Sequence, residues 1–308
     1  MERLVNAKVD SGRCAIVWLG HGGFALKPHS GDVIVVDPFL SPGDSGVNSR
    51  PRLQQPPIKP QNVKLDYLFL THDHPDSADP DTLTHIVHKN PDATIVCPPS
   101  CCRLLSHLGV PNDNIQVLTA GQHMSFPNFV VHATPAYHTD DSLGYVFEFD
   151  QTDASPAEVC VYHTGHSAFD PGLACAVADF GPDVLLVPIS GEDGNMDAES
   201  AATLTAHIAP SEVIPMSYGT FRGTDVDVDQ FASLVADAKD REDQIATVPM
   251  QVGACHIFCP EASLHGRHGA KLARAERALK ARKGHEHRDG VRGPNGGSGI
   301  ARGAGRGH

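Results

Sequence analysis

The strongest constraint on the fold is a pattern of short β-type runs through the first 260 residues. The runs are rich in Val, Ile and Phe and are bounded by Gly, Pro, Asn or Asp, which is typical of strands in a packed sheet. The early runs meander and the later ones alternate with helical segments, which predicts two packed sheets with helices outside. The expected strands lie at 14–19, 32–37, 66–70, 94–97, 129–134, 144–149, 158–163 and 184–188, and the expected helices at 79–89, 98–108, 195–208 and 227–240.

The last part of the chain differs in composition from the rest. Residues 261–308 carry eleven Lys and Arg against four Asp and Glu, although the whole chain has a net charge of −13. We therefore expect one domain over 1–260 and a basic, Gly-rich, disordered tail over 261–308, because so few apolar residues cannot offset the entropy of ordering. The acidic domain would repel nucleic acid. The favoured interpretation of the tail is a solvated extension, and a weak arm for an anionic partner or nucleic acid is the alternative.

The sequence also limits where the protein works. No run approaches 18 apolar residues, and the first residues lack the apolar core of a signal peptide. Several of the eight cysteines lie in apolar runs and none forms a C-x-x-C pair, which is typical of buried free thiols in a reducing compartment. We expect a cytoplasmic protein without a membrane span, a disulfide framework or a cysteine-based zinc site.

The clearest chemical signal follows the expected strand at 66–70. The segment THDHPDSADP presents His72 and His74 as a His-x-His pair, with Asp76 two residues later. Such a pair at a strand end can reach one metal ion, and neutral imidazole nitrogens suit zinc and iron. Asp76 adds a carboxylate that can bind metal or hold a proton.

Other histidines follow other strands. His138 lies at the exit of one strand and His166 just beyond another, so both are candidate ligands, although each could instead be an ordinary turn or packing histidine. His132 and His163 lie within or at the edge of a strand and are interpreted as structural. Asp37, before Pro38, is either a turn residue or a carboxylate that supports a metal-binding histidine.

These segments together resemble the metallo-β-lactamase superfamily, and within it the L-ascorbate-6-phosphate lactonase-like and related metal-dependent hydrolases. The resemblance implies an α/β (α+β) fold, the αββα sandwich of two mixed sheets flanked by helices. It also implies up to two metal ions at one edge and an activated water that attacks an ester, lactone, amide or phosphoester. The matching motifs are WLGHGGFAL (18–26), VVDPFLSP (35–42), THDHPDSADP (71–80), TPAYHTDDSLGYVFEF (134–149), VYHTGHSAFDP (161–171), LLVPISGEDGNMDAESAA (185–202) and VIPMSYGTF (213–221).

The chain departs from the family pattern at three positions. Ser77 and Ser217 stand where the family has histidines, and His166 stands where it has a bridging aspartate. A neutral imidazole has one free lone pair and no charge, so it cannot bridge two cations as a carboxylate does. The transferred pattern therefore leaves His72, His74 and His138 for one metal.

The resulting hypothesis is a hydrolase of a small ester, lactone or phosphoester that uses one divalent metal, with zinc expected and manganese or iron as alternatives. Asp76 would be a ligand or general base, and His166 a fourth ligand or proton shuttle. Substrate contacts are expected at His21, Ser217 and Arg222, although Arg222 could simply be solvated. A homo-oligomer is an open expectation. The alternatives are a non-catalytic binding protein on the same fold and a mononuclear iron oxidoreductase.

Overall fold

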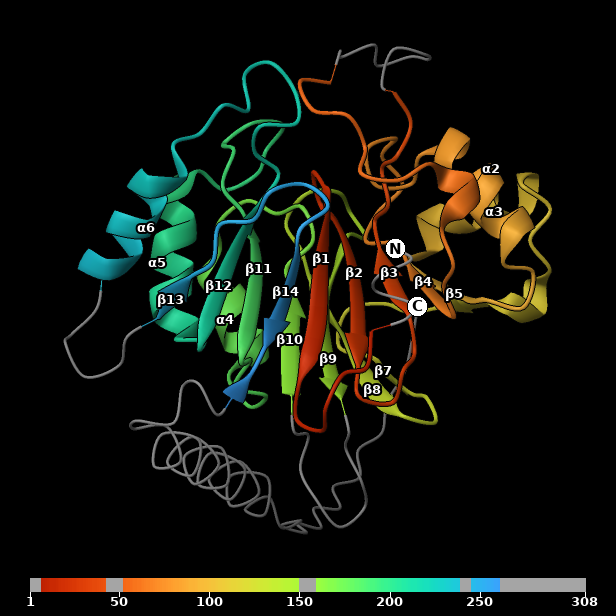
Figure 1. Ribbon diagram of the computed structural model, residues 1–308, viewed down its shortest axis with the longest axis horizontal. Coiled ribbons are helices and arrows are strands. Elements are labelled where there is room, and N and C mark those ends of the chain that lie inside the picture. The colour runs from red at the N-terminus through yellow and green to blue at the C-terminus, as the bar shows by residue number, and fades with distance from the viewer. Residues whose placement is uncertain (1–6, 43–51, 150–158, 239–244, 261–308) are drawn as a thin grey trace, which may run out of the picture. The chain divides into compact units, whose positions relative to one another are not determined.

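The computed structural model describes residues 7–42, 52–149, 159–238 and 245–260. Over these residues the chain forms two mixed β-sheets that pack face to face, with helices on their outer sides (Figure 1). This is the αββα sandwich expected from the sequence. The expected tail, 261–308, lies outside the described residues.

The first sheet is antiparallel at one end and parallel at the other. Its strand order is β14-β1-β2-β3-β4-β5-β6, with antiparallel pairing as far as β3 and parallel pairing beyond it. The parallel pairing of β3, β4 and β5 brings their carboxyl ends to one edge. The strands are β1 (Cys14–Gly20), β2 (Gly23–Pro28), β3 (Ile34–Val36), β4 (Tyr67–Phe69), β5 (Thr94–Cys97), β6 (Ile115–Val117) and β14 (Cys255–Phe258).

The second sheet has the same mixed character. Its order is β13-β12-β11-β10-β9-β8-β7, parallel from β13 to β10 and antiparallel from β10 to β7. The strands are β7 (His123–Ser125), β8 (Phe129–Pro135), β9 (Leu143–Phe149), β10 (Val159–His163), β11 (Val184–Pro188), β12 (Glu212–Met216) and β13 (Ala246–Thr247).

Aspartates begin most of the helices. The carboxylate of Asp79 accepts from the backbone N–H groups of Asp81 and Thr82, and that of Asp197 accepts from the N–H of Ser200 at 2.9 Å. Asp197 is therefore the N-cap of the helix Ala198–Ile208. The helices are α2 (Pro80–Lys89), α3 (Cys102–His107), α4 (Pro171–Val177), α5 (Ala198–Ile208) and α6 (Val228–Asp237), with short 3-10 turns at Pro60–Asn62, Pro99–Cys101 and Asn112–Asn114.

The core has three layers. The middle layer lies between the sheets and includes Trp18, Phe69 and Phe147, all nearly or fully buried. A second layer packs the first sheet against α2 and α3, and a third packs the second sheet against α4, α5 and α6. Burial on both sides explains why the central strands read as continuous apolar runs rather than as alternating patterns.

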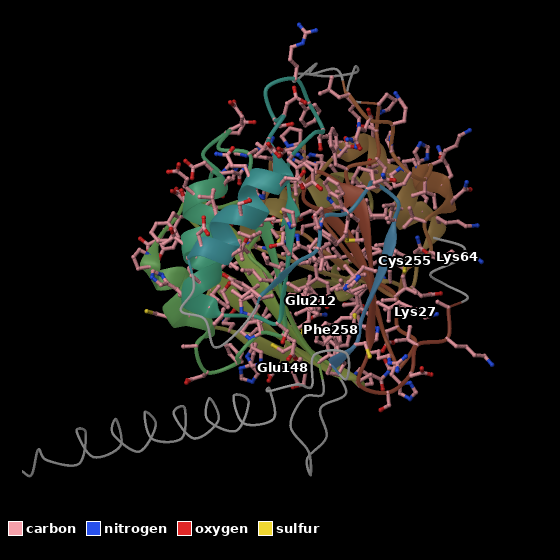
Figure 2. The ribbon with its side chains drawn as sticks, turned by 60° about the vertical axis from the view of Figure 1, so that its left-hand side comes forward. Lys27, Lys64, Glu148, Glu212, Cys255 and Phe258 are labelled. Carbon is pink, nitrogen blue, oxygen red and sulfur yellow. The ribbon has the colours of Figure 1, made fainter. Side chains whose placement is uncertain are left out.

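A hydrogen bond also joins the two sheets near their edges. The Nε2 atom of His256, on β14, lies 2.7 Å from Oε2 of Glu212, the first residue of β12. Figure 2 labels Glu212 and the two ends of β14, Cys255 and Phe258. Because β14 and β12 belong to different sheets, this contact adds a polar link outside the apolar middle layer.

All the expected strands are present, within a few residues of their predicted ends. Helix 98–108 was predicted as one element, but Pro99–Cys101 is a 3-10 turn and the α-helix begins at Cys102. The prediction missed β2 and β12, whose sequences GFALKP and EVIPM contain Gly or Pro, residues that usually argue against strands. The other missed elements are β6, β7, β13, β14 and α4, each seven residues or shorter.

Candidate metal centre

The candidate site lies where several strands end. His72, His74 and Asp76 follow β4, and His138 follows β8. His166 follows β10. The adjacent strands β1, β3 and β12 end close to His21, Asp37 and Ser217 respectively, so that six chain segments contribute to one edge of the sandwich.

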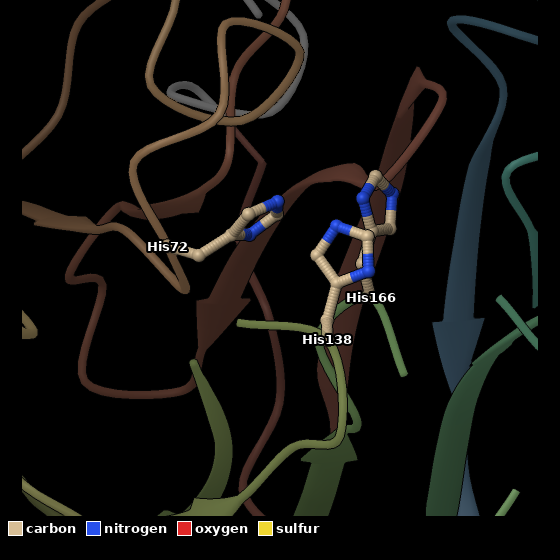
Figure 3. Close-up of side chains that lie close together, drawn as sticks. All are labelled: His72, His138 and His166. Atoms are coloured by element: carbon tan, nitrogen blue, oxygen red, sulfur yellow. The ribbon is translucent and has the colours of Figure 1, made fainter. Parts of the chain in front are cut away.

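Four imidazole rings converge at this edge. The ring centroid of His72 lies 4.9 Å from that of His74, 4.7 Å from that of His138 and 5.2 Å from that of His166. Nε2 of His138 lies 3.0 Å from Nδ1 of His74. Figure 3 shows the rings of His72, His138 and His166 grouped around a common space. The structure thus brings together all four histidines that the sequence singled out.

A buried relay fixes the orientation of His72. The hydroxyl of Thr71 donates to Oδ2 of Asp37, so its oxygen accepts from Nδ1 of His72 at 2.9 Å. The proton of His72 is therefore on Nδ1, and its Nε2 carries a free lone pair. That Nε2 is buried and has no hydrogen-bond partner among the described residues. Because a metal ligand must present an unprotonated nitrogen, His72 is already in the form that a cation requires.

Burial dominates the electrostatics of this relay. It lowers the pKa of His72 to about 3, which keeps the ring neutral at ordinary pH. It also raises the pKa of Asp37 to about 7, although two hydrogen bonds from Thr71 oppose the shift. Asp37 therefore supports His72 through the Thr71 hydroxyl and not by direct contact.

Asp76 is paired with His21. Nε2 of His21 lies 3.0 Å from Oδ2 of Asp76, and the His21 ring packs edge-on against Phe39 and Phe221. Burial by itself would raise the pKa of Asp76, but the hydrogen bond from His21 and the electrostatic influence of the surrounding imidazoles together outweigh it and hold that pKa well below its usual range. Asp76 is therefore an ionised carboxylate at ordinary pH.

His166 is held by the residue that replaces the last family histidine. Its Nε2 lies 3.1 Å from Oγ of Ser217, and both side chains are buried. Gly22 packs against the ring, because a Cβ at Gly22 would lie 3.1 Å from Nε2 of His166. Burial lowers the pKa of His166 well below its ordinary value, so the ring is neutral.

The remaining candidates lie around this cluster. Ser77 is fully buried behind the site, and Arg222 is exposed in the loop after β12. His21 and Ser217, expected as substrate contacts, make hydrogen bonds inside the site, to Asp76 and His166 respectively. Thr71 was not predicted as a site residue, although a hydroxyl residue directly before the His-x-His pair was a usable signal.

His163 differs from the cluster histidines. Its Nδ1 accepts from the N–H of Gly165 at 3.0 Å, and its Nε2 donates to the carbonyl of Gly22 at 2.9 Å. His132 lies 2.7 Å from Glu148 through Nε2. Both histidines thus have protein partners, in keeping with their interpretation as structural.

The donor set fits a divalent metal ion. Three groups of side chains each place one possible ligand atom per residue within 4.8 Å of the others. Imidazole nitrogens with a single carboxylate suit zinc, iron or manganese better than calcium or magnesium. The unpartnered Nε2 of His72 supports the same conclusion. The groups are His72, His138 and His166; His72, His74 and Asp76; and His21, Asp76 and His166.

None of the described helices is long and apolar enough to cross a membrane.

Comparison with known proteins gives the family. A UPF0173 metal-dependent hydrolase of Methanosphaera stadtmanae is 28% identical over 250 residues, which cover 77% of this chain and 97% of that protein. The structure of Igni18, a metallo hydrolase from Ignicoccus hospitalis, shares the fold with a TM-score of 0.61 at 22% identity, covering 80% of this chain and 99% of that one. The family model described as the beta-lactamase superfamily domain matches residues 15–217. The chain therefore belongs to the metallo-β-lactamase superfamily, whose relatives matched here are named metal-dependent hydrolases.

Proposed function

We propose that this protein hydrolyses a small ester, lactone or phosphoester with one tightly held divalent metal, bound by His72, His74 and His138. The observation that carries the proposal is the state of His72, which is fully buried and keeps Nε2 free among other imidazoles. Leaving a buried nitrogen unpaired costs about 1–3 kcal/mol, a cost that a bound cation removes. The hydrolase names of the relatives agree with this chemistry.

The metal supplies one thing, a bound water whose pKa falls to about 7 and which is then a nucleophile at neutral pH. The protein supplies the rest. The Asp37–Thr71 pair holds the tautomer and the ring plane of His72. Zinc is the proposed ion because imidazoles dominate the donor set, while manganese and iron suit the same residues.

Asp76 is the proposed base. Its carboxylate is ionised, and one of its oxygens lies within 4.8 Å of ligand nitrogens of His72 and His74. From there it can orient a water and accept its proton. The hydrogen bond from His21 fixes the carboxylate, so that the acceptor oxygen keeps its position.

The substrate is proposed to be a small molecule. His166 lies beside the ligand histidines as a neutral ring and serves as a fourth ligand or as a proton shuttle. Arg222, exposed after β12, is the proposed contact for an anionic group of the substrate.

The test combines metal analysis with an activity panel. Elemental analysis of dialysed protein should find about one divalent ion per chain. The panel is p-nitrophenyl acetate, a γ-lactone and bis-p-nitrophenyl phosphate, and chelation should abolish turnover that added zinc or manganese restores. A His74→Ala variant should lose both the ion and the activity, while His88→Ala, on the exposed face of α2, should keep both. Metal-free protein without activity would point to a binding protein, and iron with oxygen consumption to an oxidoreductase; either result contradicts the proposal.

A further inference from the structure

A pair of histidines lies on the second sheet, outside the candidate metal centre. His123 on β7 and His132 on β8 are direct cross-strand partners in the antiparallel ladder. Alternate residues of a strand point to opposite faces of the sheet. Val131 and Ala133 belong to the middle layer, and Met124 packs against it, so both histidines point to the outer face of the second sheet.

A carboxylate on the next strand holds one of the two rings. Glu148, labelled in Figure 2, lies on β9 opposite Val130, and it points to the same outer face because its neighbour Phe147 belongs to the middle layer. Its Oε2 lies 2.7 Å from Nε2 of His132. Because a carboxylate accepts hydrogen bonds, Nε2 of the neutral ring carries the proton and Nδ1 keeps a free lone pair.

The separation of the two rings suits a shared ion. The ring centroids of His123 and His132 lie 5.5 Å apart. In the candidate metal centre the centroids of His138 and His166 lie 5.6 Å apart, and their possible ligand atoms lie within 4.8 Å of one another. The exposed ring of His123 can turn about its side-chain bonds to complete the approach.

The surroundings fix the His132 ring and leave ring nitrogens of the pair free. The ring of Phe180 packs against that of His132 at a centroid distance of 4.3 Å, and Glu148 holds the same ring through Nε2. Among the described residues, Nδ1 of His132 and the ring nitrogens of His123 have no hydrogen-bond partner. A histidine held by a carboxylate through one nitrogen presents the other in the orientation that a metal ligand needs.

We propose that His123 and His132 bind a divalent transition-metal ion on the outer face of the second sheet, with Glu148 holding the His132 ring. Imidazole nitrogens suit zinc, copper or nickel, and water completes the coordination. Only two side chains bind the ion at this partly exposed position, so it is held more weakly than the ion of the candidate metal centre. Because β7 is the edge strand of its sheet, the ion ties that edge to β8. The site does not depend on the proposed function.

Zinc uptake tests this proposal without reference to activity. Metal-depleted protein is dialysed to equilibrium against a series of fixed free zinc concentrations, and bound zinc is measured per chain. His123→Gln and His132→Gln should each bind one equivalent fewer than wild type. Other zinc-binding residues are common to all three proteins, so only the difference is used. Glu148→Gln keeps both ligands and should weaken the affinity of this equivalent about 10–100-fold.

A local measurement and two control variants complete the test. Zinc should slow the hydrogen exchange of the β7 amides in wild type but not in His123→Gln, because the ion ties β7 to β8. His88→Ala removes an exposed imidazole whose Nδ1 lies 2.6 Å from the carbonyl oxygen of Thr84, and it should bind as much zinc as wild type. His72→Ala should keep the equivalent at β7, which separates this proposal from the proposed function.

Thermal melting shows that each variant is folded. A folded His123→Gln protein that binds as many equivalents as wild type overturns the proposal. Exchange of the β7 amides in wild type that is the same with and without zinc overturns it as well.

Discussion

Two histidines, His163 in strand β10 and His72 beyond strand β4, are equally buried but differ in the hydrogen bonds of their ring nitrogens. Both are fully buried. His163 uses both ring nitrogens on backbone groups, those of Gly22 and Gly165. His72 uses one nitrogen on Thr71 and leaves the other free. The comparison teaches that a free nitrogen, and not burial, separates a candidate ligand from a histidine that holds the fold.

The largest expected effect is the loss of hydrolysis when the proposed metal ligand His72, and not His163, is removed. His72→Ala should reduce hydrolysis of any substrate of the panel by roughly a thousandfold or more, because the ring would hold the ion that activates the attacking water. The fold should remain, since the ring makes one hydrogen bond among the residues that the structure describes. Turnover per chain and the melting temperature measure the two effects. A variant that retains wild-type turnover would remove His72 from the site.

The second prediction concerns the pH dependence of folding in metal-free protein. Burial lowers the pKa of His163 to about 4, below its ordinary value of 6.5. Between these values the unfolded chain binds the proton and the folded chain does not, so stability falls as the pH drops from about 6.5 to 4 and is flat above. The loss attributable to His163 should reach roughly 3 kcal/mol at pH 4.

Urea unfolding between pH 4 and pH 7 measures this loss. His163→Gln should be less stable at neutral pH but should lose less stability on acidification than wild type, because it cannot titrate. Equal pH slopes for the two proteins would show that His163 is not a structural, neutral histidine. His72 also contributes in this pH range, so only the difference between wild type and variant is used.

A smaller effect tests the hydroxyl that holds His72. Thr71→Val removes the relay to Asp37 while keeping the side-chain volume close, and metal affinity should fall about 10–100-fold. Competition with a chelating dye measures the affinity. Thr205→Val is the matched control, because Thr205 is also fully buried but its hydroxyl bonds to the carbonyl of Ala201 on α5. Equal affinities in the two variants would argue against the relay.

The smallest expected effect comes from a substitution at Glu212, away from both histidines. Glu212→Gln weakens the contact with His256 between the two sheets, and should cost at most about 1 kcal/mol of unfolding free energy because the pair is partly exposed. Metal binding should be unchanged. A larger loss in chemical denaturation, or any loss of bound metal, would mean that this edge of the sandwich supports the site.

The sequence predicted the apolar, β-branched strands better than it predicted the strands that contain Gly or Pro. Runs such as 94–97 and 184–188 are apolar and β-branched, and local preference agrees with the final fold there. The strand β12 carries Pro215 yet pairs on both sides, since the neighbouring strands and the buried layer outweigh local preference. Fold class therefore followed from pattern, and the exact set of strands did not.

The candidate site shows the same limit. His72, His74 and Asp76 are close in sequence, so one strand end suffices to place them. The pairing of His21 with Asp76 joins residues 55 positions apart, and no local pattern encodes it. The contact of His166 with Ser217 likewise depends on how β10 and β12 are positioned in the sheet. Local residues were predictable, and the contacts that decide their roles were not.

Three of the strands that lead into the site end on residues that hold an unfavourable backbone. His21, Asp37 and Ser217 have φ values of 52°, 42° and 61°, a left-handed conformation that costs a residue with a Cβ about 1–2 kcal/mol. The apolar layers must offset this cost, so we expect this edge to withstand less heating than the two sheets. On warming, these turns should relax before the sheets separate, and heat would then inactivate the protein well before it unfolds.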